Sequence, residues 1–243
     1  MFEDLSNDAD IKTGGDYLGS EPVTSGLYRN VVIKMAYGSV ATSGAKAVNL
    51  VLETENGRTI RRTEYVSSGT AKGGKNYYEK DGERRFLPGY IVINDLCLLA
   101  TGKALAQSVV EQKTIPLYNY DEQKEIPTQV QAITSLIGKQ VNVGIITQTV
   151  DKNAKNSEGK YVPTGETRDE VTISKFFSAK DGRTVTEILA KKEEGEFQAK
   201  WEEKWTGVTP DKSKGAKKGT GTPGSAAKGA APAPSEDDLF ANA

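Results

Sequence analysis

The feature that most constrains the fold is an Asn-Gly step, Asn56-Gly57, which separates two runs of β-forming residues. This pair favours the tight turn of a β-hairpin because both residues adopt positive φ at little cost. The flanking runs, 48–54 and 59–66, are rich in Val, Leu, Ile and Thr, and residues 27–37 have a similar composition. The sequence therefore predicts a three-stranded antiparallel meander over residues 27–66.

The middle of the chain is expected to be less regular. Residues 67–81 form a Gly-, Lys- and Tyr-rich stretch that indicates a loop, and residues 104–111 are helical in composition. Pro116 and Pro127 interrupt the chain that follows, and residues 128–137 end at a glycine, as a short helix often does. This part is therefore predicted to be a helical insertion.

Strands are expected to resume over residues 139–150 and 169–177. The polar stretch between them, residues 151–168, is too long for a simple turn and is predicted to be a loop. Residues 185–205 are predicted to form a final amphipathic helix.

Three strands, helical material and two more strands is the element order of the OB fold. We therefore expect a mainly β chain with a helical insertion (α+β), built as a five-stranded Greek-key barrel with a C-terminal helix. The barrel domain is assigned to residues 26–208, with its insertion at about 88–138, after a polar lead over residues 1–25. The alternative is another α+β fold with the same order of elements.

The C-terminal part has a different composition. Residues 209–234 consist of Lys, Gly, Ala, Pro, Ser and Thr with one Asp, and they cannot bury enough apolar surface to offset the entropy of ordering. A flexible, disordered linker is expected, ending in a tip over residues 235–243. The tip holds an acidic run and an apolar pair, and the residues expected to bind a partner are Glu236, Asp237, Asp238, Leu239 and Phe240. The alternative is an ordinary frayed end.

Composition limits the possible functions. The chain has no histidine and one cysteine, Cys97, in an apolar run, so imidazole-based relays and internal disulfides are excluded. Acids that could hold a metal lack a recognisable spacing, and no phosphate-binding loop motif is present. We therefore expect no enzymatic activity, no catalytic residue, no metal and no cofactor. Because the N-terminus lacks an apolar signal region and no run is long enough to cross a bilayer, a cytoplasmic protein without a membrane partner is expected.

The distribution of charge and aromatic residues suggests a ligand. Residues 1–210 hold 27 basic and 29 acidic side chains, so a site for a polyanion must come from local clustering. Single-stranded nucleic acid is bound by rings that stack on bases and cations that follow the phosphates. The densest such cluster lies over residues 72–86, and Arg61, Thr63 and Tyr65 precede it on one face of the third strand.

Candidate stacking rings are Tyr65, Tyr77, Tyr78 and Phe86. Candidate phosphate contacts are Arg61, Arg62, Lys75, Arg84, Arg85, Lys139 and Lys155. The alternative for each residue is a half-buried tyrosine or a solvated lysine with no ligand.

Three parts of the sequence together resemble phage-encoded single-stranded DNA-binding proteins of the OB-fold type. They are the stretch from Asn76-Tyr77-Tyr78 to Arg84-Arg85, the Leu87-Pro88-Gly89-Tyr90 segment that leads into residues 94–103, and the acidic, aromatic tip. The similarity covers most of residues 25–200 as a pattern. It implies a protein that coats and protects single-stranded DNA during phage DNA replication, recombination and repair and recruits partners through its acidic tail. Bacterial members commonly end in a terminal Phe carboxylate, whereas three residues follow Phe240 here, so a pocket for a terminal carboxylate would not fit.

Two other functions stay open on the sequence. One is a phage structural or assembly protein whose tail is a docking peptide and whose body binds no nucleic acid. The other is a nuclease that uses carboxylates and a metal. The sequence leaves the choice between DNA and RNA, the site size and the oligomeric state open.

Overall fold

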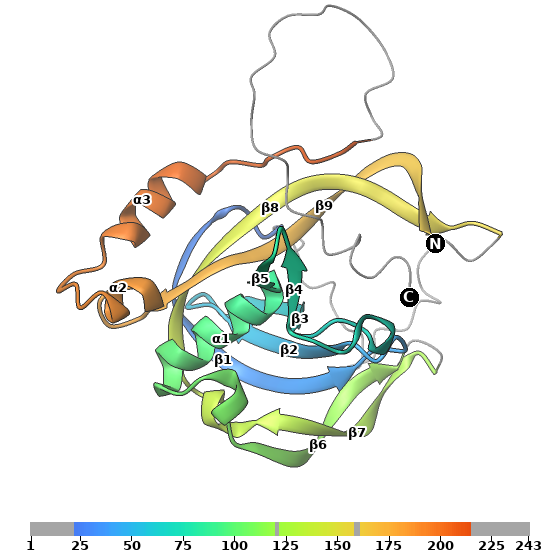
Figure 1. Cartoon of the computed structure of the whole chain (residues 1–243), viewed down its shortest axis with the longest axis horizontal. Coiled ribbons are helices and arrows are strands. Elements are labelled where there is room, and N and C mark those ends of the chain that lie inside the picture. Colours follow the sequence, from blue (N-terminus) through green and yellow to red (C-terminus); the bar gives the residue numbers. More distant parts are fainter. Residues whose placement is uncertain (1–21, 120–121, 158–160, 215–243) are drawn as a thin grey trace, which may run out of the picture.

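The computed structural model describes residues 22–119, 122–157 and 161–214, and the chain is mainly β (Figure 1). Strands β1 (Gly26–Val40), β2 (Lys46–Glu53) and β3 (Thr59–Tyr65) form the predicted antiparallel meander, in the spatial order β3-β2-β1. The alternation of their side chains places one set, including Leu50, Leu52 and Ile60, in the core.

Strands β8 (Gln140–Lys155) and β9 (Tyr161–Ser178) form a long hairpin, and β8 also pairs with the first half of β1. The pairing of β8 with β9 continues as far as Lys155 and Tyr161, so the prediction of a loop over residues 151–168 is wrong. An irregularity between Asp151 and Asn153 lets the two strands stay paired through this polar stretch.

The region predicted to be a helical insertion, at about 88–138, holds a helix in its first part and strands in its second part. Strands β6 (Val110–Asn119) and β7 (Lys124–Ile133) form a hairpin that joins the second half of β1 through β7. Between residues 102 and 138 helix is confined to the short 3-10 turns η2 (Leu105–Gln107) and η3 (Thr134–Leu136), so the helices predicted over residues 104–111 and 128–137 are wrong. Pro116 and Pro127 lie opposite each other, where β7 pairs with β6 alone and a missing N–H group is tolerated.

The helix of this region lies earlier in the chain, as α1 (Pro88–Thr101). Proline occupies its first turn and Gly102, in the left-handed conformation, ends it. Its buried residues Ile93, Leu96 and Cys97 pack into the core cluster of the sheet. The ion pair between Asp95 of α1 and Lys175 of β9, at 3.0 Å, adds a half-buried link to the second hairpin.

The predicted C-terminal helix is divided into α2 (Val185–Leu189) and α3 (Glu196–Trp205). The buried Glu187 side chain accepts backbone N–H bonds from Thr184, Glu196 and Phe197, and it therefore caps both helices. Trp201 of α3 packs edge-on against Phe177 of β9, with ring centroids 6.1 Å apart. α3 contacts β8 and β1, and α2 contacts α1 (Figure 1).

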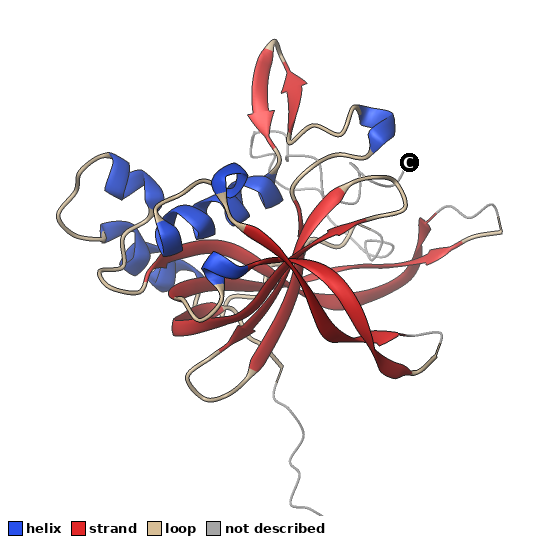
Figure 2. Ribbon diagram, turned by 90° about the horizontal axis from the view of Figure 1, so that it is seen from below, coloured by secondary structure: helices blue, strands red, loops and turns tan. Residues whose placement is uncertain are grey.

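The prediction of a mainly β chain with helical material is confirmed, but the sheet is not a closed five-stranded barrel. It is antiparallel and has seven strands. Five of them follow in the order β3-β2-β1-β7-β6, β8 pairs with β1, and β9 pairs with β8. Among the described residues, β3 pairs only with β2 and β9 only with β8, and α1 contacts both of these strands. Figure 2 shows the strands fanning out, with most of the helical segments gathered on one side.

The residues that follow α3 run beside β8. Thr149 donates its N–H to the Pro210 carbonyl at 2.9 Å and accepts the Lys212 N–H at 2.8 Å, which makes a parallel bridge. The linker predicted from residue 209 is thus paired to the body over its first residues. The remainder of the linker, the tip and residues 1–21 lie outside the described residues. In the part of the chain that is described, no helix has the length and apolar character needed to cross a membrane.

Candidate nucleic-acid interface

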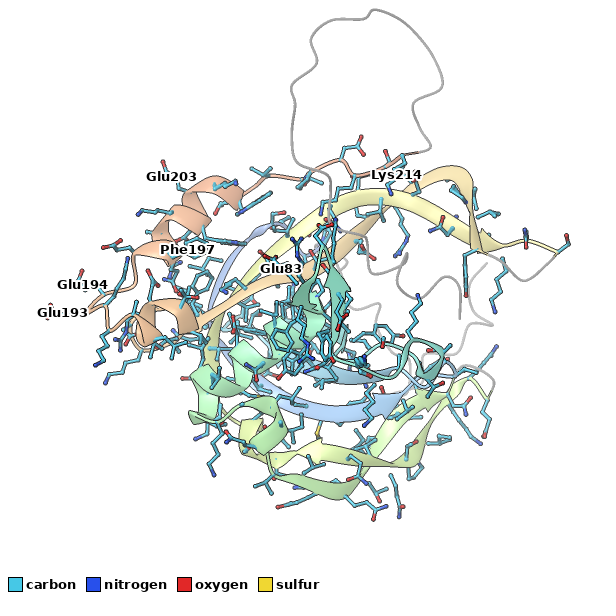
Figure 3. All side chains as sticks on the ribbon, viewed as in Figure 1. Glu83, Glu193, Glu194, Phe197, Glu203 and Lys214 are labelled. Atoms are coloured by element: carbon cyan, nitrogen blue, oxygen red, sulfur yellow. The ribbon has the colours of Figure 1, made fainter. Side chains whose placement is uncertain are left out.

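The densest basic and aromatic stretch folds as a hairpin of its own. Strands β4 (Tyr77–Lys80) and β5 (Glu83–Phe86) pair through a turn in which Asp81 and Gly82 both have positive φ, so the expected loop over residues 67–81 is in part a strand. Before it lies the 3-10 turn η1 (Thr70–Lys72). The β4–β5 hairpin stands away from the main sheet in both ribbon views (Figures 1 and 2), with Glu83 near its turn (Figure 3).

One face of the hairpin carries a cluster of aromatic rings. Tyr77 lies opposite Phe86, and their rings meet edge-on with centroids 6.4 Å apart. Phe86 in turn stacks on Tyr90 of α1, at 5.4 Å and an interplanar angle of 28°. Phe86 remains 49% exposed, so the cluster presents apolar ring surface to solvent. We call Tyr77, Phe86 and Tyr90 the aromatic cluster.

Two cations lie over the same cluster. The Arg84 guanidinium is 4.8 Å and the Lys75 ammonium 5.3 Å from the centroid of the Tyr77 ring, both within cation–π range. Arg84 also lies 3.9 Å from the Glu79 carboxylate, but both side chains are largely exposed, so this ion pair holds the guanidinium weakly. The arrangement places exposed rings and positive charge on one surface.

The other face of the hairpin has a different character. Tyr78 lies opposite Arg85, and Arg85 is 3.5 Å from Glu83. Since neighbouring residues of a strand point to opposite faces, Tyr77 and Tyr78 cannot contribute to the same surface. The structure therefore divides the predicted tyrosine pair between two faces.

The base of the hairpin is fixed to the sheet. Leu87 donates its N–H to the Asn76 carbonyl at 2.9 Å, and Ser68 donates to the Lys75 carbonyl at 2.8 Å. A Cβ atom at Gly89 would lie 2.4 Å from the Tyr65 carbonyl oxygen, so α1 begins in direct contact with the end of β3. The aromatic cluster is thus held close to Tyr65.

Strand β3 separates its two predicted arginines. Arg61 and Thr63 are exposed and share the face of Tyr65, which points away from the core. Arg62 lies on the core side, with its side chain 22% exposed and its guanidinium 3.9 Å from the buried Glu64. The Arg62 Nε atom is buried without a hydrogen-bond partner. Arg61 and Arg62 therefore do not act on the same surface.

The two remaining predicted lysines lie elsewhere. Lys139 follows η3, where its carbonyl accepts the Ile33 N–H at 2.9 Å. Lys155 is at the far end of the β8–β9 hairpin, with its ammonium 5.5 Å from the centroid of the exposed Tyr161 ring. That end and the β4–β5 hairpin project in different directions in both views (Figures 1 and 2), so Lys155 is not part of the aromatic cluster.

Sequence reasoning missed Tyr90, and the signal was present in the sequence. Tyr90 follows Pro88, which begins a helix readily, and it comes four residues after Phe86. The predicted tail residues 236–240 lie outside the described residues. Over residues 22–119, 122–157 and 161–214, no group of three acids or cysteines is placed to hold a metal ion.

A comparison of the chain with protein-family models gives no match, and neither does a comparison with curated proteins.

Proposed function

We propose that the protein binds single-stranded DNA and that the aromatic cluster on the β4–β5 hairpin is its principal contact. The observation that carries this proposal is the grouping of Tyr77, Phe86 and Tyr90 with two cations within 5.3 Å of one ring. Rings of this kind stack on bases of any sequence, and cations beside them neutralise phosphates. Phe86 is exposed in the free protein, and stacking on a base would remove its apolar surface from water.

The strand pairing supports an OB-type core as part of the same proposal. β1 pairs with both β2 and β8, and α1 lies in the chain between β3 and β8, as an OB-fold helix lies between strands 3 and 4. In this reading the β4–β5 and β6–β7 hairpins are insertions into the five-stranded order. The aromatic cluster is then a surface that the inserted β4–β5 hairpin adds to the core.

The biological role that we propose rests on the similarity of the sequence pattern to phage single-stranded DNA-binding proteins. In that role the protein coats single-stranded DNA during replication and recombination, and residues 236–240 recruit partner proteins. The body binds the DNA without a metal, and no reaction follows.

The test is binding of labelled oligo(dT) measured by fluorescence anisotropy in EDTA. Phosphate contacts predict that log K falls with log salt by about 0.7 for each phosphate neutralised. Tyr77→Ala and Phe86→Ala should each weaken binding by roughly 1–3 kcal/mol. Tyr118→Ala is the matched control, because Tyr118 is 52% exposed but belongs to the β6–β7 hairpin.

Three outcomes would contradict the proposal. Absence of oligo(dT) binding would favour the assembly-protein alternative. Cleavage of the oligonucleotide on addition of Mg²⁺ would favour the nuclease. Equal losses for the Tyr77, Phe86 and Tyr118 variants would place the contact away from the aromatic cluster.

A further inference from the structure

Strand β6 is an open edge of the main sheet. It pairs with β7 along Val110–Asn119, and no other strand among the described residues pairs with it. Residues Val110–Thr114 are all exposed, and the apolar side chains of Val109 and Val110 are 54% and 49% exposed. Helix α1 contacts the edge strands β3 and β9, whereas β6 lies at the lower margin of the molecule in Figure 1. The edge of β6 is therefore accessible to a further strand.

The two prolines of the β6–β7 hairpin show which backbone groups of β6 point outward. Pro116 lies opposite Pro127, and the pairing continues through this position without a break. In an antiparallel ladder, pairs that exchange two N–H···O bonds alternate with pairs that exchange none. Because neither proline has an N–H group, their pair is of the second kind. Every second residue shares the orientation of Pro116, so Val110, Gln112 and Thr114 turn their N–H and C=O groups toward the open edge.

The side chains of this edge are complementary to themselves about Gln112. Glu111 precedes Gln112 and Lys113 follows it. A two-fold axis at Gln112 would therefore set the Glu111 carboxylate of each copy opposite the Lys113 ammonium of the other, and such cross-strand pairs stabilise a sheet. The same axis sets Val110 opposite Thr114, and the outward N–H and C=O groups of these two residues can then bond to each other.

Other registers of the same edge lack this complementarity. An axis at Glu111 would bring two carboxylates together and an axis at Lys113 two ammonium groups, and like charges directly opposite each other destabilise a sheet. An axis at Thr114 would set Pro116, which has no N–H group, against the outward groups of Gln112. Charges and prolines commonly protect an edge strand from pairing. On β6 they exclude these registers and leave the one centred on Gln112 open.

We propose that two copies of the chain associate through antiparallel pairing of their β6 strands, centred on Gln112. The five-strand path β3-β2-β1-β7-β6 of one copy then continues into that of the other, and the dimer carries two aromatic clusters. Edge pairing of this length makes a small interface, so we expect a reversible dimer in the micromolar range. The pairing goes beyond the proposed function and does not depend on it, because none of its contacts involves nucleic acid.

The first experiment measures self-association of the full chain by sedimentation equilibrium, without nucleic acid. The wild type should show a monomer–dimer equilibrium. Glu111→Lys and Lys113→Glu should each weaken the dimer roughly 10- to 30-fold, because each change sets like charges opposite each other at two places. A 1:1 mixture of the two variants should associate again, since opposite charges then meet. Glu125→Lys on β7 is the matched control: it changes the net charge as Glu111→Lys does, away from the paired edge, and should leave association unchanged.

The second experiment tests the register by disulfide formation. Gln112→Cys would set the thiols of the two copies opposite each other, with Cα atoms about 5.5 Å apart, a distance that a disulfide can span. Mild oxidation should therefore give a covalent dimer on a non-reducing gel. Thr114→Cys is the matched control, because Thr114 shares the exposed face of Gln112 but lies off the axis, so its two copies do not meet. The native Cys97 is buried and should not form a cross-link.

Three results would overturn the pairing. The first is a wild-type chain that stays monomeric up to its solubility limit. The second is a dimer that both charge reversals leave unchanged, since the contact would then lie elsewhere. The third is a Gln112→Cys variant that forms no more covalent dimer than the Thr114→Cys variant. None of these results bears on the proposed function, which binding of oligo(dT) tests separately.

Discussion

Gly89 of α1 lies against the main-chain carbonyl of Tyr65 in β3 so closely that a Cβ atom at position 89 would be 2.4 Å from that oxygen. Real Cβ atoms do not approach backbone oxygens to this distance, so any other residue would push the helix away from the strand. The contact joins the first turn of α1, which carries Tyr90, to the end of the strand that carries Arg61. The position of the aromatic cluster relative to the sheet therefore depends on the absence of a side chain at Gly89.

Gly89→Ala should destabilise the protein by about 1–3 kcal/mol, the usual cost of an added group in a packed region. Denaturant unfolding followed by circular dichroism measures this cost. Gly26→Ala is the control, because nothing lies within 4 Å of a Cβ atom at that position. Equal stabilities of the two variants would show that α1 can move away from β3 freely.

Arg61→Gln and Arg62→Gln should have different effects although the residues are adjacent. Loss of the exposed Arg61 should weaken oligo(dT) binding and reduce the salt slope by about 0.7, the value for one phosphate contact. Arg62→Gln should instead lower stability by about 1–3 kcal/mol, because it removes the cation 3.9 Å from the buried Glu64 carboxylate. A reduced salt slope in the Arg62 variant would place that guanidinium on the binding surface after all.

Glu187 should make folding stability depend on acid pH. Burial alone would raise the pKa of its carboxyl, but the backbone N–H groups of Thr184, Phe197 and Glu196 outweigh burial and lower it. A carboxyl with a lowered pKa contributes its full stabilisation above its unfolded-state pKa, near 4.5, and loses it as the pH falls through the folded-state value. Glu187→Gln should therefore cost about 2 kcal/mol at neutral pH, and the difference from the wild type should shrink below about pH 4.

The measurement for Glu187 is denaturant unfolding at several pH values. Glu203→Gln provides the control, since Glu203 is exposed on the solvent side of α3 (Figure 3) and should show no such loss. A constant difference between wild type and the Glu187 variant across the acid range would mean that this carboxylate is not the titrating cap.

Deletion of residues 235–243 should raise affinity for single-stranded DNA at low salt. The pairing of Lys212 with Thr149 fixes where the predicted linker leaves the body. If the linker is as flexible as its composition predicts, its ends would lie roughly 25 Å apart. The acids of the tip can then compete with DNA for the body's cations at a millimolar effective concentration. Salt should reduce the gain by screening this competition. Anisotropy titrations at two salt concentrations measure the effect, and a lower affinity on deletion would refute the competition.

Phe240→Ala should abolish the capture of replication proteins while leaving oligo(dT) affinity unchanged. Aromatic anchors dominate small interfaces, and Phe240 is the aromatic residue of the predicted tip. Pull-down from infected-cell extract with wild-type and variant protein tests this, with Asn242→Ala as the control. Identical capture by both variants would mean that the tip is not a docking peptide.

The sequence predicted the parts of the fold that depend on local signals. The meander followed from Asn56-Gly57 and from runs of β-formers, and β8 and the later part of β9 followed from similar runs. The β6–β7 hairpin was missed because Pro116 and Pro127 normally interrupt strands, and only its position at the margin of the sheet permits them. The division of the last helix was missed because Glu187 caps α3 through a contact that no periodicity reveals.

The composition of the sequence predicts which stretch of the chain holds the candidate site, but not which of its side chains share a surface. Local clustering singled out residues 72–86, and Tyr77, Arg84 and Phe86 do lie together. Tyr77 and Tyr78 lie on different faces because residues 77–80 pair with residues 83–86, whereas the sequence predicts a loop over residues 67–81. Arg61 and Arg62 are separated by the pairing of β3 with β2, which decides which side of β3 faces the core. Tyr90 joins the cluster through the contact of α1 with β3, which no local pattern indicates.

The parallel bridge between residues 210–212 and Thr149 has a mechanical consequence for anything attached to the C-terminus. Its two hydrogen bonds lie side by side across parallel strands, so a pull along the axis of β8 loads both at once. A pull away from the sheet instead breaks the bonds one after another, beginning with the bond from the Lys214 N–H to the Asp151 carboxylate, followed by the Lys212 bond and then the Pro210 bond. A partner that holds the tail would therefore meet a stiff attachment in one direction and a yielding one in the other, and the bridge would transmit force to the body selectively.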